Sequence, residues 1–190
     1  MMRSEGAQEA GLRRELRAAP GLAIVTGGQT GVDTYAAHAA LRAGVPVHLV
    51  FPAGLRQEDG LLTPARRRRL SGAILHELSD PGFEYRTWTG VYVSDAVLLL
   101  DPAGGAGCQE TVRATERLGR PLLSPDPDSL TAESAAAWLA QTGARVVLVA
   151  GCRASVLAGA GKGRGLHSAL ARFMAAARRR HDELAAPAGS

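Results

Sequence analysis

Aromatic residues and cysteine are scarce in this sequence, and their scarcity excludes several functions. The 190 residues include three Phe, three Tyr and two Trp. Because these aromatics do not alternate with basic residues, the chain lacks a platform on which nucleic acid bases could stack, and despite a net charge of +4 we expect no nucleic acid partner. The two cysteines, Cys108 and Cys152, lack CxxC spacing, which favours a reduced, cytoplasmic setting.

Long hydrophobic runs and clustered metal ligands are missing as well. No apolar stretch reaches the length of a membrane span, so we expect no membrane partner. Residues 1–20 carry many charges among alanines, which predicts a polar helix or tail and argues against a signal peptide. The five histidines are scattered, and His76-Glu77 lacks a second histidine four residues further on. We therefore expect no protein-bound metal site.

A glycine-rich loop stands between the first apolar run and the first helical pattern. Residues 27–33 read GGQTGVD and follow the apolar residues 22–25. Strand, tight loop and helix in this order present backbone N–H groups that favour anions, phosphate above all. The glycines do not match G-x-G-x-x-G, and Gly161-Lys162 lacks the context of a Walker A loop. The loop thus predicts a phosphate site of another kind, and a purely structural turn is the alternative.

A second glycine-rich loop follows the strongest predicted strand, residues 96–100. Residues 101–110 read DPAGGAGCQE and lead into a helix that runs to Leu118. Both loops follow strands, and the carboxyl ends of parallel strands lie at one edge of a sheet. If the two strands neighbour one another at a topological switch point, the two loops converge on one site.

Strands alternate with helices along the whole chain. Further strands are predicted at residues 45–50, 73–78, 121–123 and 145–150, and helices at residues 32–43, 85–93, 126–141 and 166–184. The pattern predicts an α/β fold, a single Rossmann-like domain with a doubly wound, mainly parallel sheet and helices on both faces. We expect this domain at residues 21–184, after the N-terminal helix or tail and before a loose C-terminal tail at residues 185–190.

Two motifs together point to a known family. They are GGQTGVD at residues 27–33 and P-x-G-x-R-x-E-D-G at residues 52–60, supported by Arg86-Thr87, Ser94-Asp95 and Gly104-Gly105. Over roughly residues 22–175 the sequence resembles the molybdenum carrier family, a circularly permuted branch of the lonely-guy-like (SLOG) superfamily of Rossmann-like proteins. The resemblance implies a binding or carrier protein for molybdenum cofactor (molybdopterin) or a related phosphorylated heterocycle, with a molybdoenzyme as recipient.

A more distant resemblance implies an enzyme. Gly104-Gly105-Ala106-Gly107-Cys108-x-Glu110 is similar to the G-G-x-G-T-x-E segment of lonely-guy phosphoribohydrolases, which cleave the base from nucleoside 5'-monophosphates. The similarity assigns catalysis to Glu110 and Arg86. A carboxylate can stabilise the positive charge that develops on the ribose or position water, while an arginine holds phosphate or the leaving base. A glutamate in the first turn of a helix that serves stability alone is the alternative.

A nucleotide-sensing regulatory module that signals through oligomerisation is a third hypothesis. Because superfamily members commonly associate, we expect a homo-oligomer.

The two resemblances and the loop chemistry share one set of candidate residues. The candidate ligand- and phosphate-binding residues are Gly27, Gly28, Gln29, Thr30, Gly31, Asp33, Arg56, Glu58, Asp59, Arg86, Asp95, Gly104, Gly105, Gly107 and Cys108.

The sequence also departs from the carrier pattern. Ala53 stands where the family usually has lysine, and Cys152 replaces the proline that usually follows Ala-Gly. The glycine-rich residues 159–165, with two cations, form a longer stretch than expected and fit either a lid or a simple connection. The sequence alone therefore leaves open which ligand the protein binds and whether it turns that ligand over as an enzyme.

Overall fold

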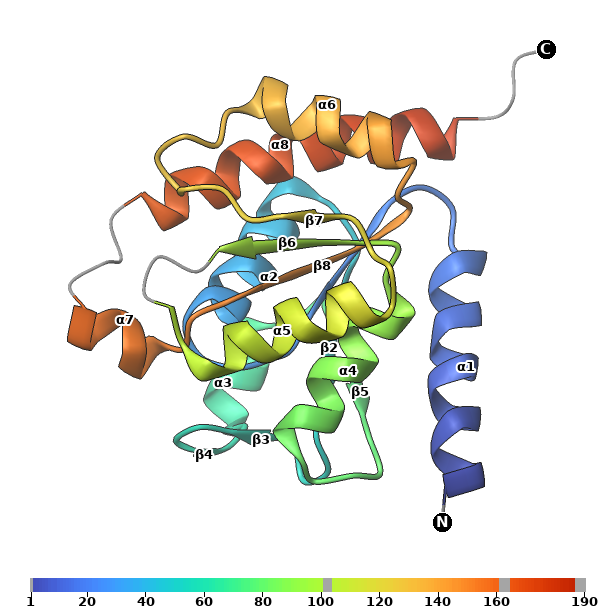
Figure 1. The fold of residues 1–190 in the computed structure, drawn as a ribbon, viewed down its shortest axis with the longest axis vertical. Helices are drawn as coiled ribbons and strands as arrows, with labels where there is room; N and C mark the ends of the chain where they lie inside the picture. The colour runs from blue at the N-terminus through green and yellow to red at the C-terminus, as the bar shows by residue number, and fades with distance from the viewer. Residues whose placement is uncertain (1, 101–103, 161–164, 187–190) are drawn as a thin grey trace.

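A six-stranded sheet forms the centre of the molecule. The computed structural model describes residues 2–100, 104–160 and 165–186. The strands follow the order β5-β2-β1-β8-β6-β7 and all pair in parallel. Their bounds are β1 Ala23–Thr26, β2 Val47–Phe51, β5 Ile74–Glu77, β6 Ala96–Leu100, β7 Leu122–Leu123 and β8 Val146–Gly151, and a separate antiparallel hairpin joins β3 Arg56–Gln57 to β4 Gly60–Leu61 (Figure 1).

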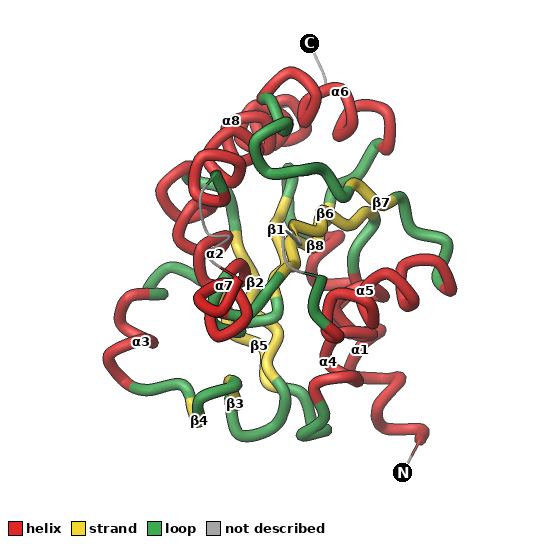
Figure 2. The backbone as a smooth tube through the Cα atoms, turned by 60° about the vertical axis from the view of Figure 1, so that its left-hand side comes forward, coloured by secondary structure: helices red, strands yellow, loops and turns green. Residues whose placement is uncertain are grey.

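Helices cover both faces of the sheet. One layer contains α1 (Met2–Ala18), α4 (Phe83–Val93) and α5 (Ala106–Arg117), and the other contains α2 (Val32–Ala43), α6 (Ala132–Thr142) and α8 (Leu166–Ala185) (Figure 2). Two short helices, α3 (Pro64–Arg69) and α7 (Ala154–Ala160), lie outside these layers. The predicted fold class, a doubly wound parallel sheet with helices on both faces, is confirmed.

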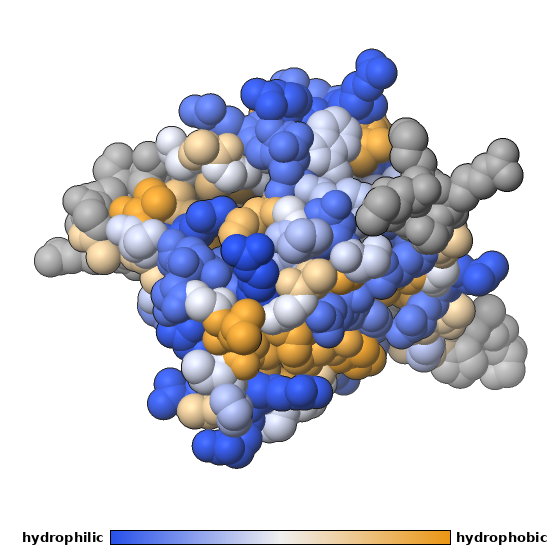
Figure 3. Space-filling view, turned by 90° about the horizontal axis from the view of Figure 1, so that it is seen from below, coloured by the Kyte–Doolittle hydropathy of each residue, from blue (hydrophilic) through white to orange (hydrophobic). Residues whose placement is uncertain are grey.

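The central strands are apolar because both of their faces are covered. Every residue of β1, β2 and β6 is buried, which is the reason why these strands read as continuous apolar runs in the sequence. One core lies under α2, α6 and α8, and the second lies under α1, α4 and α5. The surface seen from below is largely hydrophilic, with one hydrophobic area near its centre (Figure 3).

The strand order creates a topological switch point beside β8. From β1 the chain moves outward to β2 and β5, then crosses to β6 and β7, and β8 returns between β1 and β6. The loops that follow β1 and β6 therefore diverge to opposite sides of β8. In open α/β sheets, ligands bind in the crevice that such diverging loops leave at the carboxyl ends of the strands.

Three local features differ from the sequence-based expectation. Helix α6 begins at Ala132 and not at Asp126, because Thr131 caps it in a reciprocal capping box with Ser134, whereas Asp126 closes a turn before it. The β3-β4 hairpin stands where only a loop was expected. Helix α7 was not predicted, and the stretch of residues 159–165 that was singled out above lies largely outside the described residues.

Helix α1 packs on the domain through an apolar stripe. Leu12 and Leu16 are buried in the second core, and Gln8 bonds to the backbone of Glu77 and Ser79. No helix in the described ranges combines the length and the apolar character needed to cross a membrane.

We expect Leu16→Ala to lower the free energy of unfolding by about 2–5 kcal/mol, because it removes buried methyl groups and leaves a cavity under α1. Leu16 is 2% exposed, whereas Leu61 is 63% exposed, so Leu61→Ala is the matched control and should change stability by less than about 0.5 kcal/mol. Urea unfolding measures both variants. Equal values for the two would show that α1 contributes nothing to the stability of the domain.

Candidate functional site

A cavity of about 390 Å³ lies at the switch point, within the range of small-molecule sites. We call it the switch-point cavity. The loops after β1 and β8, the start of α4 and the start of α5 form its walls. It is lined by Gln29, Asp33, Phe83, Glu84, Arg86, Thr87, Gly105, Ala106, Gly107, Cys108, Glu110, Thr111, Ala150, Gly151, Cys152, Arg153 and Val156.

A buried ion pair forms the floor of this cavity. Arg86 Nη1 of α4 lies 3.3 Å from Asp33 Oδ2 of α2, and the two side chains are only 12% and 6% exposed. The guanidinium rests directly on the Gly27 backbone, where a Cβ atom would overlap it. Gly28 has a φ of +69° and faces the Phe51 ring too closely for any side chain. The first two glycines of the loop are therefore required by packing.

Burial dominates the electrostatics of the pair. It raises the pKa of the Asp33 carboxyl, although the Arg86 charge and a hydrogen bond from the Gln29 backbone N–H oppose the shift. Burial likewise lowers the pKa of the Arg86 guanidinium, against the attraction of Asp33. Arg86 Nε and Gln29 Nε2 are buried donors that find no acceptor among the described residues. Both belong to side chains that line the cavity, so a bound acceptor could satisfy them.

The opposite wall is the first turn of α5. Gly105 is its N-cap, and Ala106 and Gly107 follow, so the positive end of the helix dipole lies at this wall and favours an anion. Glu110 lines the same wall. Its carboxylate accepts a hydrogen bond from the Trp88 indole N–H at 2.7 Å and pairs with Arg113 at 2.6 Å. The glutamate is thus held in a fixed position at the cavity.

Arg153 is a site residue that the sequence reading missed. It follows β8 at the carboxyl edge and lines the switch-point cavity, with its guanidinium 5.2 Å from the centre of the Phe83 ring. A cation over a ring face is a favourable contact. Its position directly after the last apolar strand was the signal that could have identified it.

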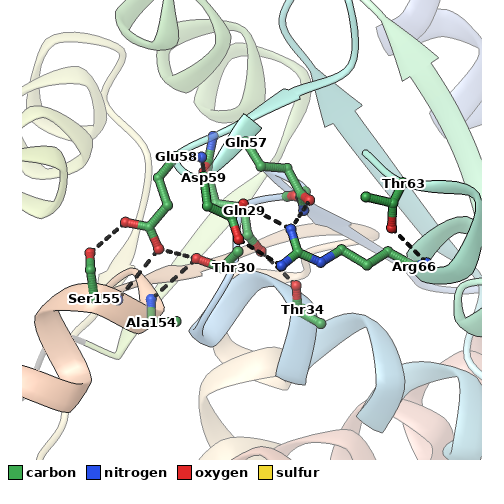
Figure 4. Close-up of polar contacts among 11 residues, drawn as sticks. Gln29, Thr30, Thr34, Gln57, Glu58, Asp59, Thr63, Arg66, Ala154 and Ser155 are labelled. Carbon is green, nitrogen blue, oxygen red and sulfur yellow. Dashed lines mark hydrogen bonds and ion pairs between the residues drawn. The ribbon is translucent and has the colours of Figure 1, made fainter. Parts of the chain in front are cut away.

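A second cavity, of about 520 Å³, lies on the other side of the GGQTG loop. We call it the hairpin cavity because the β3-β4 hairpin and α3 form much of its wall. Glu58 of the hairpin accepts hydrogen bonds from the hydroxyls of Thr30 and Ser155 and from the Ser155 backbone N–H (Figure 4). We refer to these contacts as the Glu58 latch. The latch joins the hairpin to both the GGQTG loop and α7.

The same wall contains a second set of polar contacts (Figure 4). Arg66 binds both oxygens of Asp59, at 2.8 and 2.6 Å, and donates to Gln57 at 2.9 Å. Gln57 in turn donates to the Gly28 carbonyl at 2.7 Å. Arg66 belongs to a run of four arginines at residues 66–69, and its contacts hold the hairpin in place.

The structure distributes the predicted site residues over several places. Gln29, Asp33, Arg86, Gly105, Gly107, Cys108 and Glu110 meet at the switch-point cavity, and Thr30, Gly31, Glu58 and Asp59 line the hairpin cavity. Gly27 and Gly28 lie behind these surfaces, next to Arg86 and Phe51. Gly104 precedes α5 and lines neither cavity, and residues 101–103 of its loop lie outside the described residues. Arg56 is exposed, with its guanidinium 5.8 Å from the centre of the Phe83 ring.

The placement of Asp95 corrects the sequence-based site. Asp95 precedes β6, so it lies at the amino edge of the sheet, opposite both cavities. There its carboxylate pairs with Arg17 and accepts hydrogen bonds from the backbone N–H groups of Arg145 and Val146, each at 3.1 Å. Asp95 joins α1 to the start of β8, and we therefore remove it from the candidate site.

Comparison with known proteins relates this geometry to one family. The family model of the circularly permutated YpsA SLOG family matches residues 24–171. A crystal structure of a protein of Syntrophus aciditrophicus SB, named putative molybdenum carrier protein, superposes with a TM-score of 0.64. The two sequences are 26% identical, and the match covers 82% of this chain and 94% of that one. No curated protein matches the sequence.

We expect the Glu58 latch to make stability depend on pH. Burial alone raises the pKa of the Glu58 carboxyl, but the hydrogen bonds from Ser155 and Thr30 outweigh burial and hold the pKa below its ordinary value. The latch therefore stabilises the fold fully above the unfolded-state pKa of about 4.3, and the stabilisation is lost as the pH falls through the lower folded-state pKa.

Glu58→Gln should cost about 1–3 kcal/mol at pH 7, and the difference from the wild type should shrink as the pH falls below about 4.3. Urea unfolding at a series of pH values measures this difference. Exposed Glu116 is the control, and Glu116→Gln should follow the wild type throughout. A Glu58→Gln curve parallel to that of the wild type would rule out the latch.

Proposed function

The chain belongs to the circularly permutated YpsA SLOG family, and on this premise we propose that it is a binding and carrier protein for molybdenum cofactor or a related phosphorylated heterocycle. We assign the ligand to the switch-point cavity. The observation that carries the proposal is the meeting of both glycine loops with two arginines at this edge of the sheet. The name of the Syntrophus protein, a molybdenum carrier, supports the choice of cargo.

The chemistry of the cavity fits a ligand with one anionic and one aromatic end. Arg153 and the helix dipole at the first turn of α5 supply positive potential for a phosphate. The unsatisfied donors on Arg86 and Gln29 can bind ring or phosphate oxygens. Phe83 and Val156 give the same cavity apolar surface for a flat heterocycle. A phosphorylated pterin combines these two ends.

The wider setting of this function is also a proposal. A carrier has to release its cargo, which implies a recipient molybdoenzyme. A homo-oligomeric state and a cytoplasmic location agree with this role.

We expect Arg153→Ala to weaken binding of molybdenum cofactor by about tenfold to a hundredfold, because it removes one charge-assisted contact worth about 1.5–3 kcal/mol. Arg117 is the matched control, since it lies exposed on α5 and lines neither cavity. Equilibrium binding to the wild type, Arg153→Ala and Arg117→Ala measures the effect. If the two variants bind equally well, the cargo does not occupy the switch-point cavity.

One observation favours an enzymatic alternative, hydrolysis of nucleoside 5'-monophosphates to base and ribose 5-phosphate. Glu110 and Arg86 line the same cavity, as this chemistry requires. Departure of the base leaves positive charge on the ribose carbon, which the Glu110 carboxylate could stabilise while water attacks. The phosphate would use the same arginine and helix terminus as the cofactor.

Incubation with a panel of nucleoside monophosphates, followed by chromatography for free base, separates the two functions. If the protein is an enzyme, Glu110→Gln should reduce base release by a factor of about 10² to 10⁴ while binding of the nucleotide persists. Glu116 is a second glutamate of α5 and faces solvent, so the Glu116→Gln variant should release base at the wild-type rate. Absence of base release from every nucleotide would reject the enzyme and leave the carrier proposal standing.

A further inference from the structure

Three side chains that the sequence scatters converge on one point between α1 and the sheet. They are Glu15 of α1, His48 of β2 and His76 of β5, and each offers a ligand atom within 4.8 Å of the other two. The two histidine nitrogens, Nδ1 of His48 and Nε2 of His76, lie 2.9 Å apart. In the described part of the chain this is the one group of three or more His, Cys, Asp or Glu side chains with such proximity.

The register of the sheet explains why the histidines meet. β2 and β5 pair in parallel, with His48 opposite Ile74 and Val50 opposite His76. Residues opposite one another, and those two positions further along, point to the same face of a sheet, so both histidines face the same way. Val50 belongs to the core under α1 together with Leu16. The shared face is thus the one that α1 covers, and Glu15 of that helix completes the group.

The two histidines lie in a largely enclosed place. His48 is only 4% exposed, and His76 is half-buried. Neutral imidazole is the form of histidine that acts as a metal ligand. The ring planes are nearly parallel, at an angle of 11°, and the ring centres lie 5.2 Å apart.

We propose that Glu15, His48 and His76 form a binding site for a divalent transition metal, with Zn²⁺ as the best match. Two histidines and one carboxylate are a common zinc donor set, and they leave one position of a tetrahedral ion for water. Zinc–nitrogen bonds of about 2.0–2.1 Å place two ligand nitrogens roughly 3.3 Å apart. The nitrogens now lie 2.9 Å apart, as in a hydrogen bond, so both rings have to turn until their lone pairs converge on the ion.

The site ties α1 to the sheet. Glu15 lies outside residues 24–171, the region that the family model matches, whereas both histidines lie inside it. None of the three residues lines the switch-point or the hairpin cavity. The metal site is therefore independent of the proposed carrier function, and its role is to hold the N-terminal helix on the domain.

Equilibrium dialysis of the chelator-treated protein against ZnCl₂ tests the site. We expect about one tightly bound Zn²⁺ per chain, and a loss of affinity of about a hundredfold or more in His76→Ala, since even residues that only support a ligand cost 10–100-fold. His167 is exposed on α8, and His167→Ala should bind zinc as the wild type does. Absence of saturable binding, or equal affinity in the two variants, overturns the proposal.

Hydrogen exchange tests the part played by Glu15. Zn²⁺ should slow amide exchange in α1 of the wild type and should not slow it in Glu15→Gln, an exposed substitution that leaves the core intact. The Glu116→Gln variant is the control and should behave as the wild type. If zinc leaves exchange in α1 unchanged in the wild type, the assignment of Glu15 as a ligand is wrong.

Discussion

The buried ion pair between Arg86 and Asp33 is the contact on which the candidate site depends. Withdrawing two charges from water costs several kcal/mol for each ion, and only close geometry with additional hydrogen bonds offsets that cost. Asp33 meets this requirement through Arg86 and the Gln29 N–H. Gly27 allows the approach because it has no Cβ atom. The pair fixes α4 against the start of α2 at the floor of the switch-point cavity.

The same contacts change the role of the GGQTG loop. The Gln29 N–H donates to Asp33, the Val32 N–H donates to the Cys152 carbonyl, and the Gly28 carbonyl accepts from Gln57. Amides that are already paired within the protein contribute little to a phosphate. The loop therefore organises the two cavities from its place between them. Anion binding is better assigned to Arg153 and to the positive end of the α5 dipole, both of which lie at the switch-point cavity.

The sequence predicts most of the fold because its central strands are buried on both faces and its helices end at glycines. Gly44 and Gly143 adopt the left-handed conformation that closes α2 and α6. Prediction fails where the signal is short or ambiguous. The β3-β4 hairpin has only two residues in each strand, and α6 has competing start signals at Asp126 and Thr131. Asp95 was misplaced because it was chosen as a motif position, although it directly precedes the predicted strand of residues 96–100 and so belongs to the amino edge of the sheet.

Contacts between segments that lie far apart in the chain could not be predicted from the sequence, for a further reason. His48 and His76 are 28 residues apart, and no spacing rule for metal ligands on one helix or loop applies to them. Their proximity follows only from two facts of the folded sheet: that β5 pairs with β2, and that the register sets both side chains on one face. A buried imidazole pair must also be satisfied, since unpaired polar groups are costly in a core. His48 and His76 satisfy each other through their ring nitrogens, and Glu15 of α1 lies close to both. Helix α1 also supplies Gln8 to the end of β5 and Arg17 to Asp95. A polar helix at the N-terminus is thus bound to the domain by side chains whose partners become visible only once the strand order is known.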